Sequence, residues 1–336
     1  MKILLLRFSS IGDIVLTTPV VRCLHEQLGA EVHFLTKTAF APILAPNPYI
    51  ARIFTFQKEV TEVLPELKKE GYDRVIDLHH NLRSLRVKLV LGCPVRSFDK
   101  LNFEKWLLVN LKIDRLPKVH IVQRYLATVQ HLGVQDDGRG LDYFIPESEE
   151  VVVSSLSPQL MEGRFVAFVV GAAHATKQLP VSKAVAICRE LRQPVALLGG
   201  PGDRALGQAI ADGAGPQVIN LCGSLRLHQS ASVLRQSSSV LTPDTGLMHI
   251  AAALRKPIVS VWGSTTPRFG MSPWYPTGLA INTSMEVPDL PCHPCSKIGY
   301  AACPLGHFRC MLNQSEDEIR AALNPPNDRD LPKSSF

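Results

Sequence analysis

The amino-acid sequence predicts an α/β protein made of two doubly wound parallel sheets. Short apolar runs alternate with segments of helical spacing, and this pattern starts a second time after residue 162. The apolar runs are continuous rather than alternating, as expected of parallel strands that helices cover on both faces. With 336 residues, 46% of them hydrophobic, the chain is long enough for about two domains with full-sized cores.

The first unit is predicted from four apolar runs, and the second from five. Predicted strands of the first unit are KILLLRF (2–8), EVHFLT (31–36), RIFTF (52–56) and DRVIDLH (73–79), and residues 13–28 have helical spacing. Predicted strands of the second unit are RFVAFVVG (164–171), PVALLGG (194–200), QVINLCG (217–223), SVLTP (239–243) and KPIVSVWG (256–263).

A change of composition marks the link between the two units. Residues 146–159 (PESEEVVVSSLSPQ) are acidic and rich in serine, and we place the join near residues 146–162. The sequence therefore predicts an N-terminal domain at 1–155 and a C-terminal domain at 156–324. The remaining segment, 325–336, has the composition of a disordered tail.

Composition and charge restrict the class of protein. No segment reaches about 18 uncharged apolar residues, so no membrane-spanning helix is predicted. Arg7 interrupts the first apolar run and no small-residue cleavage site follows, which favours a strand over a signal peptide and a cytoplasmic protein. The net charge is +6, but residues 77–124 hold ten Lys and Arg against four Asp and Glu. Such a surface suits an anionic partner. The alternative is a solvated helix face. The segment has few aromatic residues, which argues against a nucleic-acid partner.

Polar loops follow the predicted strands at the edge where open α/β sheets bind ligands. In the loop RFSSIGD, Ser10 and Gly12 let a ligand approach the backbone, and Asp13 either caps the next helix or acts as a general base. In the loop at 169–180, Thr176 and Lys177 are candidates for contact with a phosphate, although a loop lysine is also commonly solvated.

Two further loops belong to the second unit. Gly200, Gly202 and Ala205 fit a dinucleotide-binding pattern after a strand, but Asn220 stands near the position where that pattern expects an acid. Nicotinamide binding is therefore the weaker interpretation, and Asp203 is instead a candidate for contact with a ribose.

The stretch LTPDTGLMHIAAAL (241–254) carries the most informative loop. Backbone N–H groups from Thr245 onwards would face an anion at the start of a helix, aided by the helix dipole and the ring of His249. Asp244 should not face a phosphate, but it can cap the helix or accept hydroxyl groups of a sugar. Donors for a phosphate beside an acid for sugar hydroxyls are what a nucleotide-sugar site requires, although a capped structural helix is the alternative.

Four segments together resemble glycosyltransferase family 9, the ADP-heptose lipopolysaccharide heptosyltransferases. They are S-S-I-G-D at 9–13, D-L-H-H-N-L-R-S at 77–84, T-K-Q-L-P at 176–180, and P-D-T-G-L-M-H-I-A-A-A-L at 243–254 with the following P-I-V-S-V-W-G. The resemblance runs from residue 1 to about 323. Leu179 departs from the family pattern, which has an aromatic residue at this position.

The resemblance implies a GT-B architecture, with two facing Rossmann-like domains and the active site between them. It implies an inverting enzyme that needs no metal for catalysis, transferring heptose from ADP-heptose to an anionic lipid A/core acceptor beside the inner membrane. The helix at 315–324 would cross back towards the first domain. By position, the catalytic residues are Asp13 and Lys177, the donor-binding residues are Thr176, Gly200, Asp203, Asp244, Thr245, Gly246 and His249, and the acceptor-binding residues are Ser10, Gly12, Asn81 and Arg83.

Four of the eight cysteines lie in one short segment, 292–310. Cys292, Cys295, Cys303 and Cys310 follow the spacing C-x2-C-x7-C-x6-C. This density is typical of a structural zinc site, and reduced thiols are the alternative in the cytosol. No feature of the segment indicates a catalytic zinc with an open coordination position.

Alternative functions stay open at this point. They are a GT-B transferase that uses another nucleotide sugar, a nucleotide-sugar epimerase, and a non-catalytic nucleotide-binding protein. The epimerase would leave the basic surface at 77–124 without a role, and the binding protein would have no need of Asp13.

Overall fold

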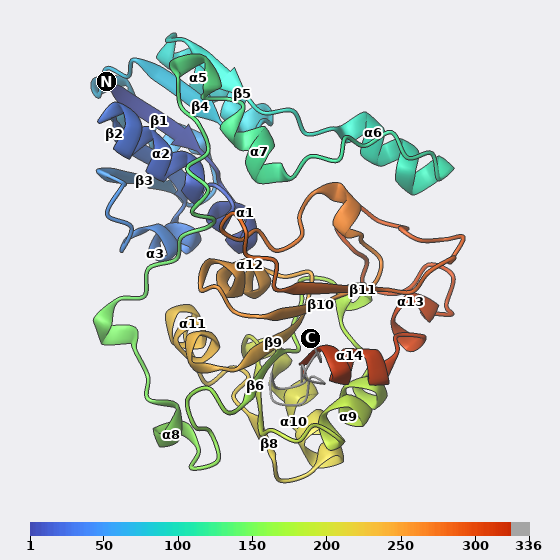
Figure 1. Cartoon of the computed structure of the whole chain (residues 1–336). Helices are drawn as coiled ribbons and strands as arrows, with labels where there is room; N and C mark the ends of the chain where they lie inside the picture. The colour runs from blue at the N-terminus through green and yellow to red at the C-terminus, as the bar shows by residue number, and fades with distance from the viewer. Residues whose placement is uncertain (324–336) are drawn as a thin grey trace, which may run out of the picture.

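The computed structural model describes residues 1–323, which form two α/β domains, each built on one parallel sheet (Figure 1). The predicted fold class is therefore confirmed. The N-terminal sheet has the order β3-β2-β1-β4-β5, with β1 (Lys2–Leu6), β2 (Glu31–Lys37), β3 (Arg52–Phe56), β4 (Arg74–Asp77) and β5 (Val95–Ser97). The C-terminal sheet has the order β11-β10-β9-β6-β7-β8, with β6 (Val166–Val169), β7 (Val195–Leu198), β8 (Val218–Asn220), β9 (Ser239–Pro243), β10 (Ile258–Trp262) and β11 (Asn282–Glu286).

Helices cover both sheets. The N-terminal domain has α1 (Ile11–Val15), α2 (Thr18–Leu28), α3 (Ala41–Leu44), α4 (Leu64–Lys69), α5 (Leu82–Leu91), α6 (Asn102–Trp106), the π-helix η3 (Leu107–Leu111) and α7 (Ile121–Leu126). After α8 (Val153–Leu156), the C-terminal domain has α9 (Val181–Arg189), α10 (Arg204–Ala214), α11 (Leu227–Gln236), α12 (Gly246–Ala253), α13 (Arg309–Leu312) and α14 (Glu316–Leu323).

The strands that the sequence reasoning missed, β5 and β11, each lie at the edge of a sheet. Central strands such as β1 and β9 are buried almost throughout, whereas β5 and β11 have no fully buried residue. An edge strand shares fewer contacts with neighbours, so its sequence (VRS or NTSME) does not need a continuous apolar run.

Both sheets reverse their strand order at their centre, and this fixes where ligands can bind. In the N-terminal sheet the reversal lies between β1 and β4, and in the C-terminal sheet it lies between β6 and β9. The loops that leave these strands diverge at such a point and open a crevice at the carboxyl edge of the sheet. The predicted site loops at 7–13 and 77–84 leave β1 and β4, and those at 169–180 and 243–246 leave β6 and β9.

The two domains meet where α1 lies beside α12 (Figure 1). One continuous cluster of buried hydrophobic residues runs from the N-terminal sheet into the C-terminal domain, including Ile3, Ile14, Met248 and Trp262. The facing starts of α1 and α12 are therefore held by a shared core.

Two expectations concern the ends of the second domain. The predicted boundary at residue 155 stays a prediction, although Val151 and Val153 already hydrogen-bond to Ser232 and Gln236 of α11. The predicted tail at 325–336 lies outside the described residues.

The expectation that the last helix returns to the first domain is wrong for the described part of α14. This helix packs on α9, β9 and β10 of its own domain. Glu316 pairs with Lys183 of α9 at 2.7 Å, and Ile319 and Leu323 are buried in the second hydrophobic cluster. The apolar face of α14 therefore completes the C-terminal core.

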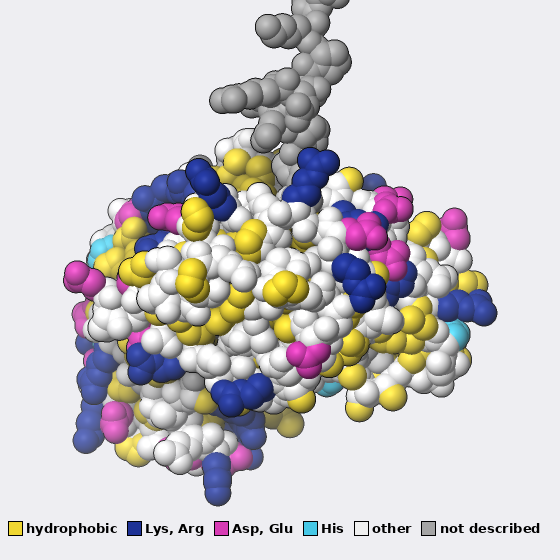
Figure 2. Space-filling model, turned by 90° about the horizontal axis from the view of Figure 1, so that it is seen from below, with side chains coloured by type: hydrophobic (Ala, Val, Ile, Leu, Met, Phe, Trp, Pro, Cys, Tyr) yellow, Lys and Arg dark blue, Asp and Glu magenta, His cyan; other side chains and the backbone are white. Residues whose placement is uncertain are grey.

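The surface is mixed in charge on the face that Figure 2 shows, where basic and acidic side chains are interspersed with hydrophobic ones. Within residues 1–323, no helix combines the length and the hydropathy that crossing a bilayer requires.

Candidate active site

The N-terminal wall of the interdomain site is organised around Arg7, the residue that interrupts the first apolar run. Its guanidinium bonds at the end of β1 to four groups: Ser9 O (2.8 Å), Leu78 O (2.6 Å), the Tyr125 hydroxyl (3.1 Å) and Asp13 Oδ1 (2.7 Å). Because Leu78 directly follows β4, Arg7 spans the point where the strand order reverses.

Asp13 is held as a carboxylate by its surroundings. Its Oδ2 accepts hydrogen bonds from the backbone N–H of Ser10 at 3.2 Å and from the Ser10 hydroxyl at 2.9 Å. Burial favours the neutral acid, but Arg7 and the Ser10 hydrogen bonds outweigh burial and lower the pKa of Asp13 below its ordinary value. The predicted general base is thus ionised at neutral pH and fixed on both oxygens.

The C-terminal wall is organised around a second ion pair, between Lys177 and Asp244. The Lys177 ammonium lies 2.6 Å from Asp244 Oδ2, which also accepts a hydrogen bond from the Thr265 hydroxyl at 3.0 Å. Lys177 comes from the loop after β6 and Asp244 from the loop after β9, so this pair lies at the reversal point of the second sheet. The predicted lysine and the predicted sugar-binding acid are therefore direct partners.

His249 lies between the two walls. It is 2% exposed, and its Nδ1 is buried without a hydrogen-bond partner among the described residues. Burial lowers the pKa of His249 to about 4, and the charges of Asp244, Asp13 and Lys177 all act on the ring. The structure thus brings these four predicted site residues together, with His249 neutral at pH 7.

Glycines allow the two walls to approach this closely. A Cβ atom on Gly12 would lie 2.5 Å from Cδ2 of His249 and 3.3 Å from Cα of Gly246. A Cβ atom on Gly246 would in turn lie 2.7 Å from Cβ of Ile11. Gly12 and Gly246 are therefore required by the contact between the domains, a reason beyond the ligand access predicted for Gly12 from the sequence.

Two threonines of the predicted donor site have structural partners. Thr245, rather than Asp244, is the N-cap of α12, and its hydroxyl accepts from Met248 N at 3.4 Å. Thr176 is 2% exposed, and its hydroxyl bonds with Ser264 and with the backbone of Tyr300. A donor contact by Thr176 would have to replace one of these bonds.

The loop after β7 carries the glycine pattern that resembles a dinucleotide site. Asp203 Oδ2 accepts from Gly200 N at 2.8 Å, and a Cβ atom on Gly171 would lie 2.1 Å from the same oxygen. Asp203 thus packs against the glycine that follows β6. The predicted contacts of Gly200 and Asp203 with a nucleotide stay predictions.

Asn81 and Arg83 lie on the side of the N-terminal domain. Asn81 caps α5, where its Oδ1 accepts from Ser84 N at 3.0 Å. The Arg83 side chain is 40% exposed and lies 3.8 Å from Glu59 Oε1. No contact joins either residue to Asp13 within residues 1–323, so their role in acceptor binding stays a prediction.

Sequence reasoning missed a group of lysines beside Asp13. Burial and the charges of Arg124, Lys297 and Lys100 together lower the pKa of Lys105 to about 8, although the charge of Asp13 acts in the opposite direction. Burial also lowers the pKa of Lys100, and Lys297 of the cysteine-rich segment acts on it too. In the described part of the chain neither Lys100 nor Lys105 has a carboxylate within ion-pair distance. The local excess of basic residues at 77–124 was a signal for these lysines, but it did not single them out.

The four clustered cysteines lie close enough for their charges to act on one another. Burial and the neighbouring Cys295, Cys292 and Cys303 together raise the pKa of Cys310 to about 12. All four thiols are free, and no three His, Cys, Asp or Glu side chains of the described chain are arranged to hold a metal ion. The predicted structural zinc is therefore not confirmed and stays a prediction.

The fold and the site together define a class of enzyme. Two facing parallel α/β domains, with a fixed carboxylate on one wall and a lysine near a helix N-terminus on the other, are the architecture of a GT-B glycosyltransferase. Residues 60–300 match the model of glycosyltransferase family 9 (heptosyltransferase), and the chain belongs to this family.

Individual relatives agree with this assignment. The chain is 27% identical over 326 residues to lipopolysaccharide heptosyltransferase 1 of Pseudomonas aeruginosa, an alignment that covers 88% of this chain and 86% of the relative. It is 24% identical over 306 residues to lipopolysaccharide heptosyltransferase 2 of Escherichia coli, covering 80% and 84%. The solved structure of the E. coli ADP-heptose lipopolysaccharide heptosyltransferase II has a TM-score of 0.70 at 21% identity and covers 96% of this chain and 98% of that one. The expected fold and transferase class are thereby confirmed.

Proposed function

We propose that this glycosyltransferase moves a heptose from ADP-heptose to an anionic lipid A/core acceptor, with inversion at the anomeric carbon. The observation that carries the proposal is the close approach of the two walls, where a Cβ atom on Gly12 would lie 2.5 Å from the His249 ring, with Asp13 on one wall and the Lys177–Asp244 pair on the other, in a chain of family 9. The similar proteins of P. aeruginosa and E. coli are lipopolysaccharide heptosyltransferases, which supports heptose and a lipopolysaccharide acceptor. The similar solved structure from E. coli is that of an ADP-heptose enzyme, which supports ADP-heptose as the donor.

The acceptor is activated at the N-terminal wall. As an acceptor hydroxyl oxygen bonds to the anomeric carbon, its proton passes to Asp13. The bond between that carbon and the diphosphate oxygen breaks at the same time, and attack from the opposite side inverts the anomeric centre. Ser10 and Arg7 keep Asp13 oriented during this step, because they bond to both of its oxygens.

The departing ADP is stabilised at the C-terminal wall. Negative charge grows on the diphosphate as the sugar leaves, and the Lys177 ammonium and the first N–H groups of α12 are donors for it. Asp244 orients Lys177 through their 2.6 Å contact and has lone pairs left for sugar hydroxyls. The N-terminal domain supplies the base and the C-terminal domain the leaving-group site, so domain closure assembles the reacting groups. No catalytic cofactor enters this scheme.

Anionic groups of the acceptor bind the lysines beside Asp13 in this scheme. Lys100, Lys105 and Lys297 come from both domains and have no carboxylate partner in the described residues. A phosphate or sugar carboxylate between them would offset their mutual repulsion.

A peripheral position on the cytoplasmic face of the inner membrane agrees with the surface of the α6–η3 arm. This arm projects from the N-terminal domain (Figure 1). It exposes Phe103, Trp106 and Leu111, which are 64%, 46% and 54% exposed, next to Lys105 and Lys112. Exposed aromatic and basic residues favour contact with an anionic bilayer.

We also propose a structural zinc at Cys292, Cys295, Cys303 and Cys310. This proposal is supported only by the spacing of the four cysteines in the sequence. The expected result is about one zinc per chain in metal analysis of protein purified without chelator, and loss of that zinc when Cys295 and Cys303 are both changed to Ser. Purified protein without bound metal would contradict it.

A donor panel tests the proposal. Purified protein is heated with ADP, UDP, GDP, CMP or NADH, since ligand binding raises apparent stability by mass action. We expect a rise in melting temperature that is selective for ADP. A rise with UDP or GDP would mean that the donor carries that nucleotide instead of ADP, with the same mechanism. A rise with NADH alone would contradict the transferase scheme. Release of ADP from ADP-heptose only when a lipid A/core acceptor is added separates a transferase from an epimerase.

A further inference from the structure

A second cluster of basic side chains lies away from the interdomain site, at the β5 edge of the N-terminal sheet. Arg74, Arg96 and His131 line a hollow of about 270 Å³. Arg74 is the first residue of β4, so the hollow begins at the end of the strand opposite to the ligand-binding edge. Neither the proposed mechanism nor the family resemblance uses these residues.

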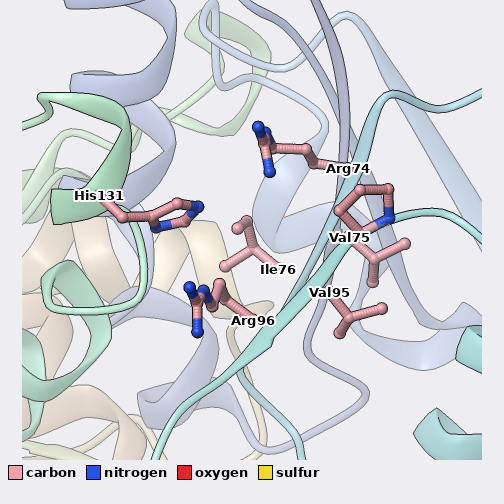
Figure 3. Close-up of a pocket in the computed structure, with 7 residues that line it drawn as sticks. Arg74, Val75, Ile76, Val95, Arg96 and His131 are labelled. Carbon is pink, nitrogen blue, oxygen red and sulfur yellow. The ribbon is translucent and has the colours of Figure 1, made fainter.

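Strand register explains why the two arginines share a face. Ile76 of β4 pairs directly with Arg96 of β5, and Arg74 stands two residues before Ile76. Residues two apart on a strand point to the same side, so Arg74, Ile76 and Arg96 face one way. Figure 3 shows the three basic side chains around one space, with Ile76 between them and the side chains of Val75 and Val95 directed away.

The charges of this cluster are not balanced by protein groups. No carboxylate lines the hollow, and within residues 1–323 no ion pair is formed by Arg74, Arg96 or His131. Burial lowers the pKa of His131, and the positive charges of Arg96 and Arg74 lower it further. An anion bound between the three side chains would offset the repulsion from the two arginines and stabilise the protonated histidine.

The space extends beyond the basic groups. A second hollow of about 330 Å³ shares Arg96 and His131 and continues along β5, where Phe98, Asp99, Arg124, Ala127 and Thr128 also line it. The first hollow offers donors for a compact anion. The second offers room, the apolar surface of Phe98 and Ala127, and one group of each charge, Asp99 and Arg124, for the molecule that carries the anion.

We propose that Arg74, Arg96 and His131 form a binding site for a phosphate group carried by a larger molecule, separate from the interdomain site. Two guanidinium groups and an imidazole supply several N–H donors, and guanidinium forks match phosphate oxygens in pairs. A phosphorylated small molecule and a lipid headgroup present the same chemistry. The proposal does not depend on the identity of the sugar donor.

NMR of the His131 imidazole tests the site directly, because this resonance reports the hollow and not the donor site. Inorganic phosphate is added at constant ionic strength, with chloride as the control. Phosphate is expected to raise the pKa of His131, since the bound anion stabilises the protonated ring. The double variant R74Q/R96Q is expected to bind phosphate about tenfold more weakly at this site.

A matched variant and a second probe complete the experiment. R164Q removes an exposed arginine of the other domain and should leave the His131 titration unchanged. Vesicles of phosphatidylcholine with and without phosphatidic acid distinguish the sources: a loss of vesicle binding in R74Q/R96Q identifies a lipid phosphate, and unchanged vesicle binding beside a phosphate-dependent His131 shift identifies a soluble one. An equal His131 response to chloride and phosphate, or an unchanged response in R74Q/R96Q, would overturn the proposal.

Discussion

The two walls of the interdomain site each carry one ion pair at the reversal point of a sheet, but the pairs are built differently. On the N-terminal wall the Arg7 side chain is 10% exposed and bonds to four groups, so the cation is fixed in the protein. On the C-terminal wall the hydrogen bonds of the Lys177 ammonium in the described residues go to a single residue, Asp244, through its backbone and carboxylate oxygens. The first pair positions its carboxylate, whereas the second can exchange its partner for a ligand.

This difference agrees with the two kinds of chemistry assigned to the walls. A general base needs one orientation, which a buried guanidinium and two Ser10 donors enforce on Asp13. A site for a leaving diphosphate needs a cation that can bind the phosphate as well as its protein partner. Lys177, which is paired with Asp244, is such a cation. The predictions below separate a fixed pair from an exchangeable one.

The largest effect is expected from removing either reacting group. Asp13→Asn should lower kcat by about 10²–10⁴-fold with ADP binding retained, because the amide accepts no proton. Lys177→Ala should lower kcat by about 10²–10³-fold and should weaken the binding of ADP as well. Turnover assays and ADP calorimetry on the same samples check both. Unchanged turnover in Asp13→Asn would refute the base assignment and favour a non-catalytic nucleotide-binding protein.

Replacing Arg7 tests whether the first pair is fixed. Arg7→Met removes a buried guanidinium together with its bonds to Asp13, Leu78 and Tyr125, which should cost about 3–5 kcal/mol of unfolding free energy. Only the Ser10 hydrogen bonds would then oppose burial at Asp13, so its pKa should rise and turnover should fall at the acidic end of the pH profile.

The direction of this change in the pH profile follows from the protonation state of Asp13. In the native enzyme Asp13 stays ionised from about pH 5 to 8, so it should give no acidic limb there, whereas Arg7→Met should show one. Lys177→Met is the matched control, because the hydrogen bonds of the Lys177 ammonium in the described residues go to Asp244 alone, and Asp244 keeps its bond from Thr265. An equal loss of stability in both variants would contradict the contrast between the two walls.

A single methyl group tests how closely the walls must approach. Gly12→Ala would bring its Cβ to 2.5 Å from the His249 ring, so the two domains should be forced apart. We expect a fall of roughly ten- to a hundredfold in kcat/KM, since small misplacements of reacting groups have effects of this size. Gly202→Ala is the control, because nothing lies within 4 Å of its added Cβ. Equal kinetics in the two variants would show that this contact is dispensable.

Local sequence signals were sufficient for the fold and for part of the site. Continuous apolar runs identified nine of the strands, because central parallel strands are buried on both faces. Asp13, Lys177, Asp244 and His249 were found because they follow strands at the carboxyl edges of the two sheets, where ligands bind. Edge strands β5 and β11 escaped because partial burial does not require an apolar run.

The rest of the site depends on contacts between segments that are far apart in the sequence. Arg7 was noticed as an interruption of an apolar run, but its bonds to Leu78 and Tyr125 span 71 and 118 residues. Leu179, which departs from the family pattern, is 5% exposed in the C-terminal core, so its side chain is a packing residue rather than a stacking platform. Neither role has a local sequence signature.

The smallest effect is expected at the lysines beside Asp13, which belong to neither ion pair. Lys105 loses its proton as the pH rises through about 8, so KM for an anionic acceptor should increase over that range in the native enzyme. Lys105→Met should raise KM a few-fold below that pH and flatten the dependence, with kcat little changed, because a binding charge is lost and not a reacting group. Lys118→Met, an exposed lysine in the same basic segment, is the control for general charge. If both variants raise KM equally, the attraction comes from the overall basic surface. If only Lys105→Met does so, the acceptor's anion binds beside the fixed base, and the N-terminal wall then orients both the acceptor and the group that deprotonates it.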